Sequence, residues 1–235
     1  IMKKDMKQLK ERLESVDYRI RGAAEACGRV SQSIRLVAVS KTMPVDIVKS
    51  AIEAGATTLG ENYVQEAQEK ITALSAYPVS WHFIGHLQSN KAKYAVRLFD
   101  LIHSVDSLKL ARELHKQAQK ADKIQSILIQ VNISGEGTKS GIAAQEAPGL
   151  ISEISRLESL SIKGLMTMPP YFYQPEKVRP FFAALRELRD EIKKHAPANV
   201  SMHELSMGMT GDFEVAIEEG ATLVRVGTAI FGERK

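Results

Sequence analysis

One lysine directly follows a short apolar segment, in a place where its amine could act as a nucleophile. Residues 36–40 read LVAVS, and Lys41 comes next, shortly before Pro44. The run is rich in β-branched residues and free of charge, which is typical of a buried parallel strand. Lysine is rarely buried without a partner or a chemical purpose. An amine at such a strand end can form an imine with a carbonyl compound; the alternative is a surface lysine that happens to follow a strand.

A second candidate is an arginine inside an apolar strand. Arg225 stands between Val224 and Val226, so the alternation of side chains along a strand puts it on the opposite face from both. A guanidinium that points into a barrel needs an acceptor. Gly227 and Thr228 follow, and amides with a hydroxyl at the start of a helix can hold a phosphate. The alternative is an arginine paired with a core carboxylate and followed by a tight turn.

The preceding strand runs into a loop of small residues that supports the phosphate interpretation. Ser206, Gly208 and Thr210 can supply hydroxyl and amide donors to an anion. Such a loop is a weak signal by itself. Thr210 could equally cap a helix, with Glu214 downstream. In a barrel, phosphate often lies at the last two strand–helix junctions, and both junctions are of this kind here.

Three further segments carry polar residues near predicted strand ends. Asn62 or Tyr63 could reach the same edge of the barrel. His82 lies within a predicted strand, and we interpret it as a hydrogen-bonded core residue. Lys139 lies in a glycine-rich loop, where a solvated turn is favoured and a transient contact with a ligand is the alternative. The remaining histidines lack the spacing of metal ligands, so we expect no metal site.

Short apolar runs alternate with longer amphipathic ones along the chain. Helical spacing of apolar residues predicts a first helix over 5–28. The strands predicted after it are 34–40, 57–60, 80–85, 101–105, 125–133, 161–168, 203–207 and 222–227, and the helices between them are 44–55, 61–75, 87–98, 107–121, 142–158, 175–194 and 211–220.

Eight βα units predict an α/β fold, a single (β/α)8 TIM barrel over 34–232, with the leading helix as an addition. No linker rich in proline, glycine or serine divides the chain, so we expect one domain over 1–235. The longest predicted loop is 169–175, with the sequence PPYFYQP. It is aromatic and follows a strand, and we interpret it as a candidate lid over the site.

Composition excludes several classes of protein. The chain has 235 residues, 44% hydrophobic and 26% charged, with a net charge of +4 that predicts no specific nucleic-acid partner. Cys27 is the single cysteine, which excludes an intrachain disulfide and fits a reducing cytoplasm. No apolar run is long enough for a membrane span, and the first residues do not resemble a signal peptide. Motifs for dinucleotides, nucleoside triphosphates and serine hydrolases are absent from the sequence. We expect a cytoplasmic monomer.

Several segments together resemble one family closely, the pyridoxal 5′-phosphate homeostasis proteins. The resemblance spans about the whole barrel and is most specific where WHFIGHLQSNK and LSMGM occur together with VRVGT. At Thr210 the family has serine more often, and threonine keeps the hydroxyl. The segments are SKTMP at 40–44, GENYVQE at 60–66, WHFIGHLQSNK at 81–91, NISGEGTKSG at 132–141, KGLMTM at 163–168 and ELSMGMTGDFEVAIEEGATLVRVGTAIFG at 204–232.

This resemblance implies a barrel like the N-terminal domain of alanine racemase, with pyridoxal 5′-phosphate (PLP) as cofactor. It implies that Lys41 carries the cofactor as an internal aldimine and that Arg225 lies near the pyridine nitrogen. Around the phosphate and the ring, it implies that the remaining cofactor-binding residues are Asn62, Met166, Ser206, Met207, Gly208, Gly227 and Thr228.

Three classes of function compete. The resemblance implies a non-catalytic PLP carrier or regulator in vitamin B6 homeostasis, which passes cofactor transiently to PLP-dependent apo-enzymes. A single-domain amino-acid racemase is the alternative; it needs a second base, which relatives take from an additional β-domain. The sequence ends at Lys235, just after the barrel, so we expect no such domain, although Tyr63, Tyr171 or Tyr173 could substitute. The bare chemistry also permits an aldolase that uses Lys41 on a sugar phosphate. We favour the carrier and expect no catalytic residues.

Overall fold

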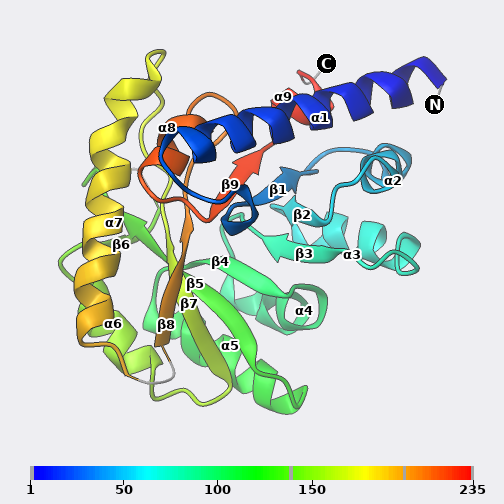
Figure 1. The fold of residues 1–235 in the computed structure, drawn as a ribbon. Helices are drawn as coiled ribbons and strands as arrows, with labels where there is room; N and C mark the ends of the chain where they lie inside the picture. The colour runs from blue at the N-terminus through cyan, green and yellow to red at the C-terminus, as the bar shows by residue number, and fades with distance from the viewer. Residues whose placement is uncertain (1–2, 138–139, 198–199, 234–235) are drawn as a thin grey trace.

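The chain folds into a closed ring of parallel strands covered by helices, as the computed structural model shows for residues 3–137, 140–197 and 200–233 (Figure 1). Neighbouring strands follow the order β4-β3-β2-β1-β9-β8-β7-β5, and pairing of β4 with β5 closes the ring. Every pairing is parallel, as expected where each strand is followed by a crossover. The strands are β1 (Arg35–Val39), β2 (Thr58–Glu61), β3 (Ser80–Phe83), β4 (Leu101–Val105), β5 (Gln125–Asn132), β6 (Ile142–Ala143), β7 (Leu160–Met166), β8 (Val200–Ser206) and β9 (Leu223–Val226).

Helices follow the strands and present their apolar faces to the ring. In α5, for example, the buried residues Leu110, Leu114 and Ala118 recur at helical spacing, and Ser107 caps the first turn through its hydroxyl. The helices are α1 (Lys3–Ala26), α2 (Val45–Glu53), α3 (Val64–Ala73), α4 (Ala92–Leu98), α5 (Leu108–Lys120), α6 (Ala147–Ile154), α7 (Arg179–Lys194), α8 (Phe213–Glu218) and α9 (Thr228–Phe231), with short 3-10 helices η1 (Ser31–Ser33), η2 (Ser89–Lys91) and η3 (Pro175–Val178).

The structure confirms the predicted barrel and its extra N-terminal helix, and it corrects two elements. The predicted helix 142–158 is shorter, because its first residues form β6, which pairs with β5 outside the closed ring. Strand β8 begins at Val200, earlier than the predicted 203–207. Its periodicity is broken at Met202, a non-glycine residue with a φ of 46°, so alternation could not be followed through that point.

Helix α1 lies across α8 and α9, next to the place where the first barrel strand, β1, pairs with the last, β9 (Figure 1). Arg19 of α1 donates to the carboxylate of Glu214 on α8 at 2.6 Å, and its guanidinium stacks over the ring of Phe213. Arg29 donates to the carbonyl of Ile217 at 2.7 Å. The extra helix therefore covers the two barrel units that come last in the chain.

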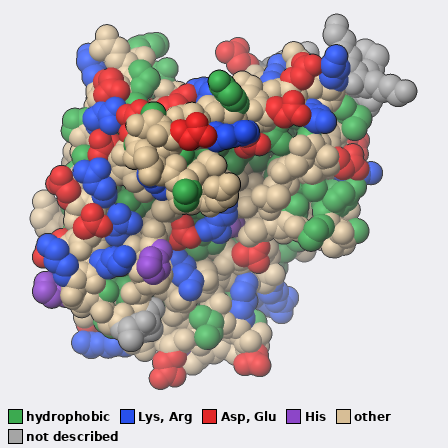
Figure 2. All heavy atoms as spheres, viewed as in Figure 1, with side chains coloured by type: hydrophobic (Ala, Val, Ile, Leu, Met, Phe, Trp, Pro, Cys, Tyr) green, Lys and Arg blue, Asp and Glu red, His purple; other side chains and the backbone are tan. Residues whose placement is uncertain are grey.

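The surface carries charges of both signs. On the face shown in Figure 2, Lys and Arg side chains are interspersed with Asp and Glu. On that face, the described residues form no continuous basic stripe of the kind that tracks a nucleic-acid backbone. Within the described parts of the chain, every helix is too short or too polar to cross a membrane.

Candidate functional site

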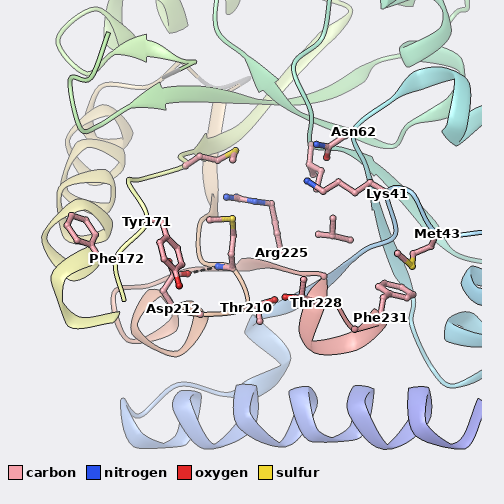
Figure 3. A pocket seen from close by; sticks show the side chains of 17 residues that line it. Lys41, Met43, Asn62, Tyr171, Phe172, Thr210, Asp212, Arg225, Thr228 and Phe231 are labelled. Atoms are coloured by element: carbon pink, nitrogen blue, oxygen red, sulfur yellow. Dashed lines mark hydrogen bonds between the residues drawn. The ribbon is translucent and has the colours of Figure 1, made fainter. Parts of the chain in front are cut away.

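One cavity opens at the carboxyl ends of the strands, the edge where barrels place their sites (Figure 3). Its volume is about 300 Å³, at the lower end of the range of small-molecule pockets. The residues around it come from β1 and β9 and from the segments that follow β1, β2, β3, β7, β8 and β9. They are Val39, Lys41, Met43, Asn62, Ile84, Met168, Tyr171, Phe172, Met209, Thr210, Gly211, Asp212, Arg225, Gly227, Thr228, Phe231 and Gly232.

Lys41 enters this cavity from the end of β1. It is partly buried, and Figure 3 shows its side chain extended into the cavity toward the region of Asn62 and Arg225. Strand β1 is fixed between β2 and β9, so the Cα position of Lys41 is set by the barrel itself. The next residue, Thr42, has a φ of 65°, a conformation that β-branched residues rarely adopt. The backbone therefore turns sharply at the lysine.

Arg225 forms the opposite part of the cavity and is only 4% exposed. Its guanidinium donates to the Ser206 hydroxyl at 2.6 Å and to the Thr167 carbonyl at 2.8 Å. Burial lowers the pKa of Arg225 to about 10, with the nearby Asp212 acting against that effect. The side chain therefore remains a cation at neutral pH, held by two neutral acceptors rather than by a carboxylate. The Arg225 side chain points into the barrel interior, on the opposite face of β9 from Val224 and Val226, as predicted.

The hydroxyl that holds Arg225 belongs to a buried polar chain across the barrel interior. His103 Nδ1 lies 2.8 Å from Ser206 Oγ, and His103 Nε2 lies 3.0 Å from His82 Nδ1. Because a guanidinium can only donate, Ser206 Oγ accepts from Arg225. Which atom donates in the Ser206–His103 and His103–His82 contacts is set by the tautomers of the two rings. Burial lowers the pKa of His82 to about 4 and that of His103 well below its ordinary value, so both rings are neutral.

Backbone amides and two hydroxyls gather at the end of the cavity formed by the last two junctions. Thr228 is the first residue of α9, with Gly227 as its N-cap, so the first amides of α9 have no acceptor within the helix. Thr210 follows β8 and lies beside Thr228 in Figure 3. Asp212 holds this loop through its Oδ1, which accepts from the Met209 amide at 2.6 Å. Burial raises the pKa of Asp212. Hydroxyls and helix N-terminal amides arranged in this way can hold a small anion.

Asn62 supplies an unsatisfied acceptor between these groups. Its Oδ1 is buried and has no hydrogen-bond partner in the protein. Buried polar atoms without a partner are rare and expensive, and at a cavity they indicate a place where a ligand completes the bonding. The backbone of Asn62 is fixed closely, since a side chain at Gly85 would come within 2.4 Å of the Asn62 carbonyl oxygen.

The structure places five of the residues predicted to bind the cofactor on the wall of the cavity, and four others outside that wall. Lys41, Asn62, Arg225, Gly227 and Thr228 all line the cavity. The remaining four are buried and do not line it, and their assignment to the cofactor stays a prediction: Met166, Ser206, Met207 and Gly208. Lys139 lies outside the described residues.

Two of these buried residues have evident packing roles. Met166 belongs to an apolar cluster with Val37, Leu128 and Leu223, and the hydroxyl of Ser206 is bonded to Arg225 and His103. His82 is the hydrogen-bonded core residue that the sequence suggested.

Sequence reasoning found the loop 169–175 as a candidate lid and named its Tyr171, but it did not single out Phe172. Tyr171 and Phe172 line the cavity; Tyr171 stays 72% exposed and contacts Tyr173 edge-on. Asp212 was also missed as a site residue, although a carboxylate three positions after Met209 is a common loop-closing acceptor. Within the described parts of the chain, no group of three His, Cys, Asp or Glu is placed to hold a metal ion.

Comparison with known proteins fits this geometry. Residues 12–235 match the family "Alanine racemase, N-terminal domain". A "Pyridoxal phosphate homeostasis protein" of Aquifex aeolicus is 47% identical over 225 residues, which cover 96% of this chain and 98% of the relative.

Two solved structures have the same fold. PipY of Synechococcus elongatus with PLP bound superposes with a TM-score of 0.84 at 35% identity, covering 96% of this chain and 100% of PipY. The alanine racemase of Clostridium difficile has a TM-score of 0.74 at 14% identity, covering 97% of this chain and 57% of the racemase, and shares the fold alone.

Proposed function

This chain belongs to the pyridoxal phosphate homeostasis protein family, and on that premise we propose that it binds PLP in the cavity above β1 and β9 and acts in PLP homeostasis. The observation that carries the proposal is the convergence of three kinds of group on one cavity. These are an amine on Lys41, a buried cation on Arg225 and the amide and hydroxyl donors around Thr228. PLP presents an aldehyde, a ring nitrogen and a phosphate, one for each.

The residues of the cavity fit PLP, because some of their hydrogen-bonding groups have no partner within the protein. The buried Oδ1 of Asn62 lacks a partner, and the first amides of α9 lack intrahelical acceptors. A phenolic hydroxyl and a phosphate would satisfy these respectively. When bound, PLP supplies an aldehyde that reacts with amines and a ring that withdraws electrons.

Each residue would have a distinct task toward the cofactor. Lys41 would carry it covalently. Arg225 would donate to the ring nitrogen and, because it is already a cation, would disfavour protonation of that nitrogen. Thr228, Gly227 and the loop at Thr210 would hold the phosphate. Met43 and Ile84 would pack around the ring and exclude water.

We also propose that the protein holds and transfers PLP without sustained turnover. Proton abstraction from a substrate needs a second base within hydrogen-bond reach. Apart from Lys41 and Arg225, the titratable side chains that line the cavity in the described structure are Asp212 and Tyr171. Asp212 is bonded to the Met209 amide, and Tyr171 is mostly exposed on its loop. Neither is held toward the lysine, which favours a carrier over a racemase.

The test is an absorbance spectrum of PLP-saturated protein before and after borohydride reduction, with peptide mapping of the modified residue. Wild-type protein and Lys91→Ala should be coloured and modified at Lys41, whereas Lys41→Ala should be colourless. Lys91 is a suitable control because it lies outside the cavity, near the ring of Tyr94. A full-occupancy reducible adduct in Lys41→Ala would refute the assignment.

Function is tested by mixing loaded protein with a PLP-dependent apo-enzyme and following recovery of its activity. We expect recovery without measurable racemisation, transamination or decarboxylation by the loaded protein alone. Steady racemisation of alanine or serine that is abolished by both Lys41→Ala and Tyr171→Phe would overturn the carrier proposal in favour of the racemase.

A further inference from the structure

A second lysine lies buried behind the first. Lys70 of α3 is 2% exposed and does not line the cavity. Its ammonium donates to Glu61 Oε1 at 2.8 Å, to Glu66 Oε1 at 2.6 Å and to the Ser40 carbonyl at 2.6 Å. An ammonium has three hydrogens, and each has an acceptor here. We call Glu61, Glu66 and Lys70 the buried ion cluster.

The cluster is hydrogen-bonded to the residues on both sides of Lys41. The Ser40 carbonyl accepts from Lys70, and the Ser40 hydroxyl donates to Glu61 Oε1 at 2.6 Å. On the other side of Lys41, the Thr42 amide donates to Glu66. The residues on either side of the cavity lysine are therefore attached to the same three charged side chains.

The segment held in this way is the strained one. Thr42 has a φ of 65°, a region that a β-branched residue occupies only when its surroundings impose it. Three hydrogen bonds hold this turn: the Thr42 amide to Glu66, Lys70 to the Ser40 carbonyl, and the Met43 amide to the same carbonyl at 3.1 Å. If the two bonds to charged side chains are lost, we expect the turn to relax toward negative φ and the lysine side chain to leave its direction into the cavity.

We propose that Lys70 is a positioning residue for Lys41, holding the Ser40–Thr42 turn through Glu61 and Glu66 so that the cavity amine meets the aldehyde of the cofactor. The proposal rests on the proposed function and deepens it, since it separates covalent capture from non-covalent binding. If Lys70 only stabilised the fold, its loss would affect covalent capture and non-covalent binding of the cofactor alike. Removing one partner of a buried ion pair leaves the other charge uncompensated, here that of Glu61, and costs stability, so unfolding and ligand affinity have to be measured separately.

The experiment compares two ligands in Lys70→Met. PLP can react with Lys41, whereas pyridoxine 5′-phosphate has an alcohol in place of the aldehyde and tests only the ring and phosphate contacts. Loss of positioning should weaken PLP binding by about tenfold or more, the fold-change that corresponds to the strain of one such residue. Binding of pyridoxine 5′-phosphate should stay unchanged. Equal loss for both ligands, or no loss for either, would overturn the proposal.

Lys123→Met is the matched control. Lys123 also directs a partly buried ammonium to backbone carbonyls, those of Val96 and Phe99, both at 2.8 Å, and it does not line the cavity. This variant should lose stability and keep the affinity for both ligands. If it showed the same selective loss as Lys70→Met, the effect would belong to stability and the proposal would fail.

Two further variants keep the test decisive if Lys70→Met folds poorly. Glu66→Gln keeps the volume of a side chain that is 25% exposed and should give the same selective loss, more weakly. Thr42→Gly removes the strain, because glycine adopts positive φ readily. Combined with Glu66→Gln or Lys70→Met, it should restore PLP binding, and failure to restore it would contradict the role of the turn. Wild-type protein that binds neither ligand would instead refute the proposed function.

Discussion

Acidification should destabilise this protein through the two buried histidines, starting near the ordinary pKa of a histidine side chain. The pKa of His82 is lowered from 6.5 to about 4, chiefly by burial and then by the charge of Arg35. In the unfolded chain the ring binds a proton below pH 6.5, whereas in the folded protein it stays neutral until about pH 4. The unfolded state therefore gains protons first, and the free energy of unfolding falls as the pH drops through this window.

The difference in pKa gives the magnitude. At 1.36 kcal/mol for each pH unit, the full effect of His82 is about 3 kcal/mol, of which about 2 kcal/mol is lost between pH 7 and pH 5. His103 contributes in the same direction, because burial also lowers its pKa. Losses of this size matter for domains whose total stability is commonly 5–15 kcal/mol.

Urea unfolding of wild-type protein and His82→Asn at pH 7 and pH 5 measures this effect. An asparagine amide can donate to or accept from His103 Nε2 in place of His82 Nδ1, and it does not titrate. The wild type should lose about 2 kcal/mol more than the variant between the two pH values, since carboxylates titrate in both. Equal losses in the two proteins would show that His82 is not a buried neutral ring.

Other substitutions have equally definite expected outcomes. Thr228→Val should weaken PLP retention, measured by dialysis and absorbance, by about fivefold to tenfold while the melting temperature stays unchanged, because one hydroxyl bond to the phosphate is lost; unchanged retention would remove this residue from the site. Ser206→Ala should lower the free energy of unfolding by about 1–3 kcal/mol, since Arg225 loses an acceptor in a buried place; a neutral result would contradict the buried chain. Gly164→Ala should be among the most damaging changes in a thermal-unfolding assay, because its Cβ would lie 1.8 Å from the Glu204 carbonyl oxygen; normal melting would refute that contact.

The sequence was sufficient to predict the barrel because each strand is a short apolar run with β-branched residues and each is followed by an amphipathic segment. Element ends were less predictable. The pattern that suggested a helix from 142 includes β6, whose two residues are too few to show any period. In β8, the positive φ of Met202 interrupts the alternation.

For the site, individual strand ends were predictable and contacts across the barrel were not. Lys41 and Arg225 stand out because a charge interrupts or ends an apolar run, which is visible in one dimension. The link from Arg225 through Ser206 to His103 joins residues 122 positions apart in sequence, since it depends on strands that meet inside the ring. The burial of Lys70 was equally hidden, because a lysine in an amphipathic helix usually faces solvent.

The pairing of β1 with β9 also determines when the cavity can exist during synthesis. Arg35 pairs with Leu223 and Ala38 with Val226. Strand β1 is therefore synthesised almost 200 residues before its partner β9. At bacterial or eukaryotic translation rates of about 5–20 residues per second, that interval is on the order of ten seconds or more. Throughout it, the edge of β1 lacks its β9 neighbour and the apolar face of α1 lacks α8 and α9. The nascent chain therefore emerges with an open sheet edge and an uncovered amphipathic helix. The amine of Lys41 meets the cation of Arg225 and the donors around Thr228 only when β9 pairs with β1.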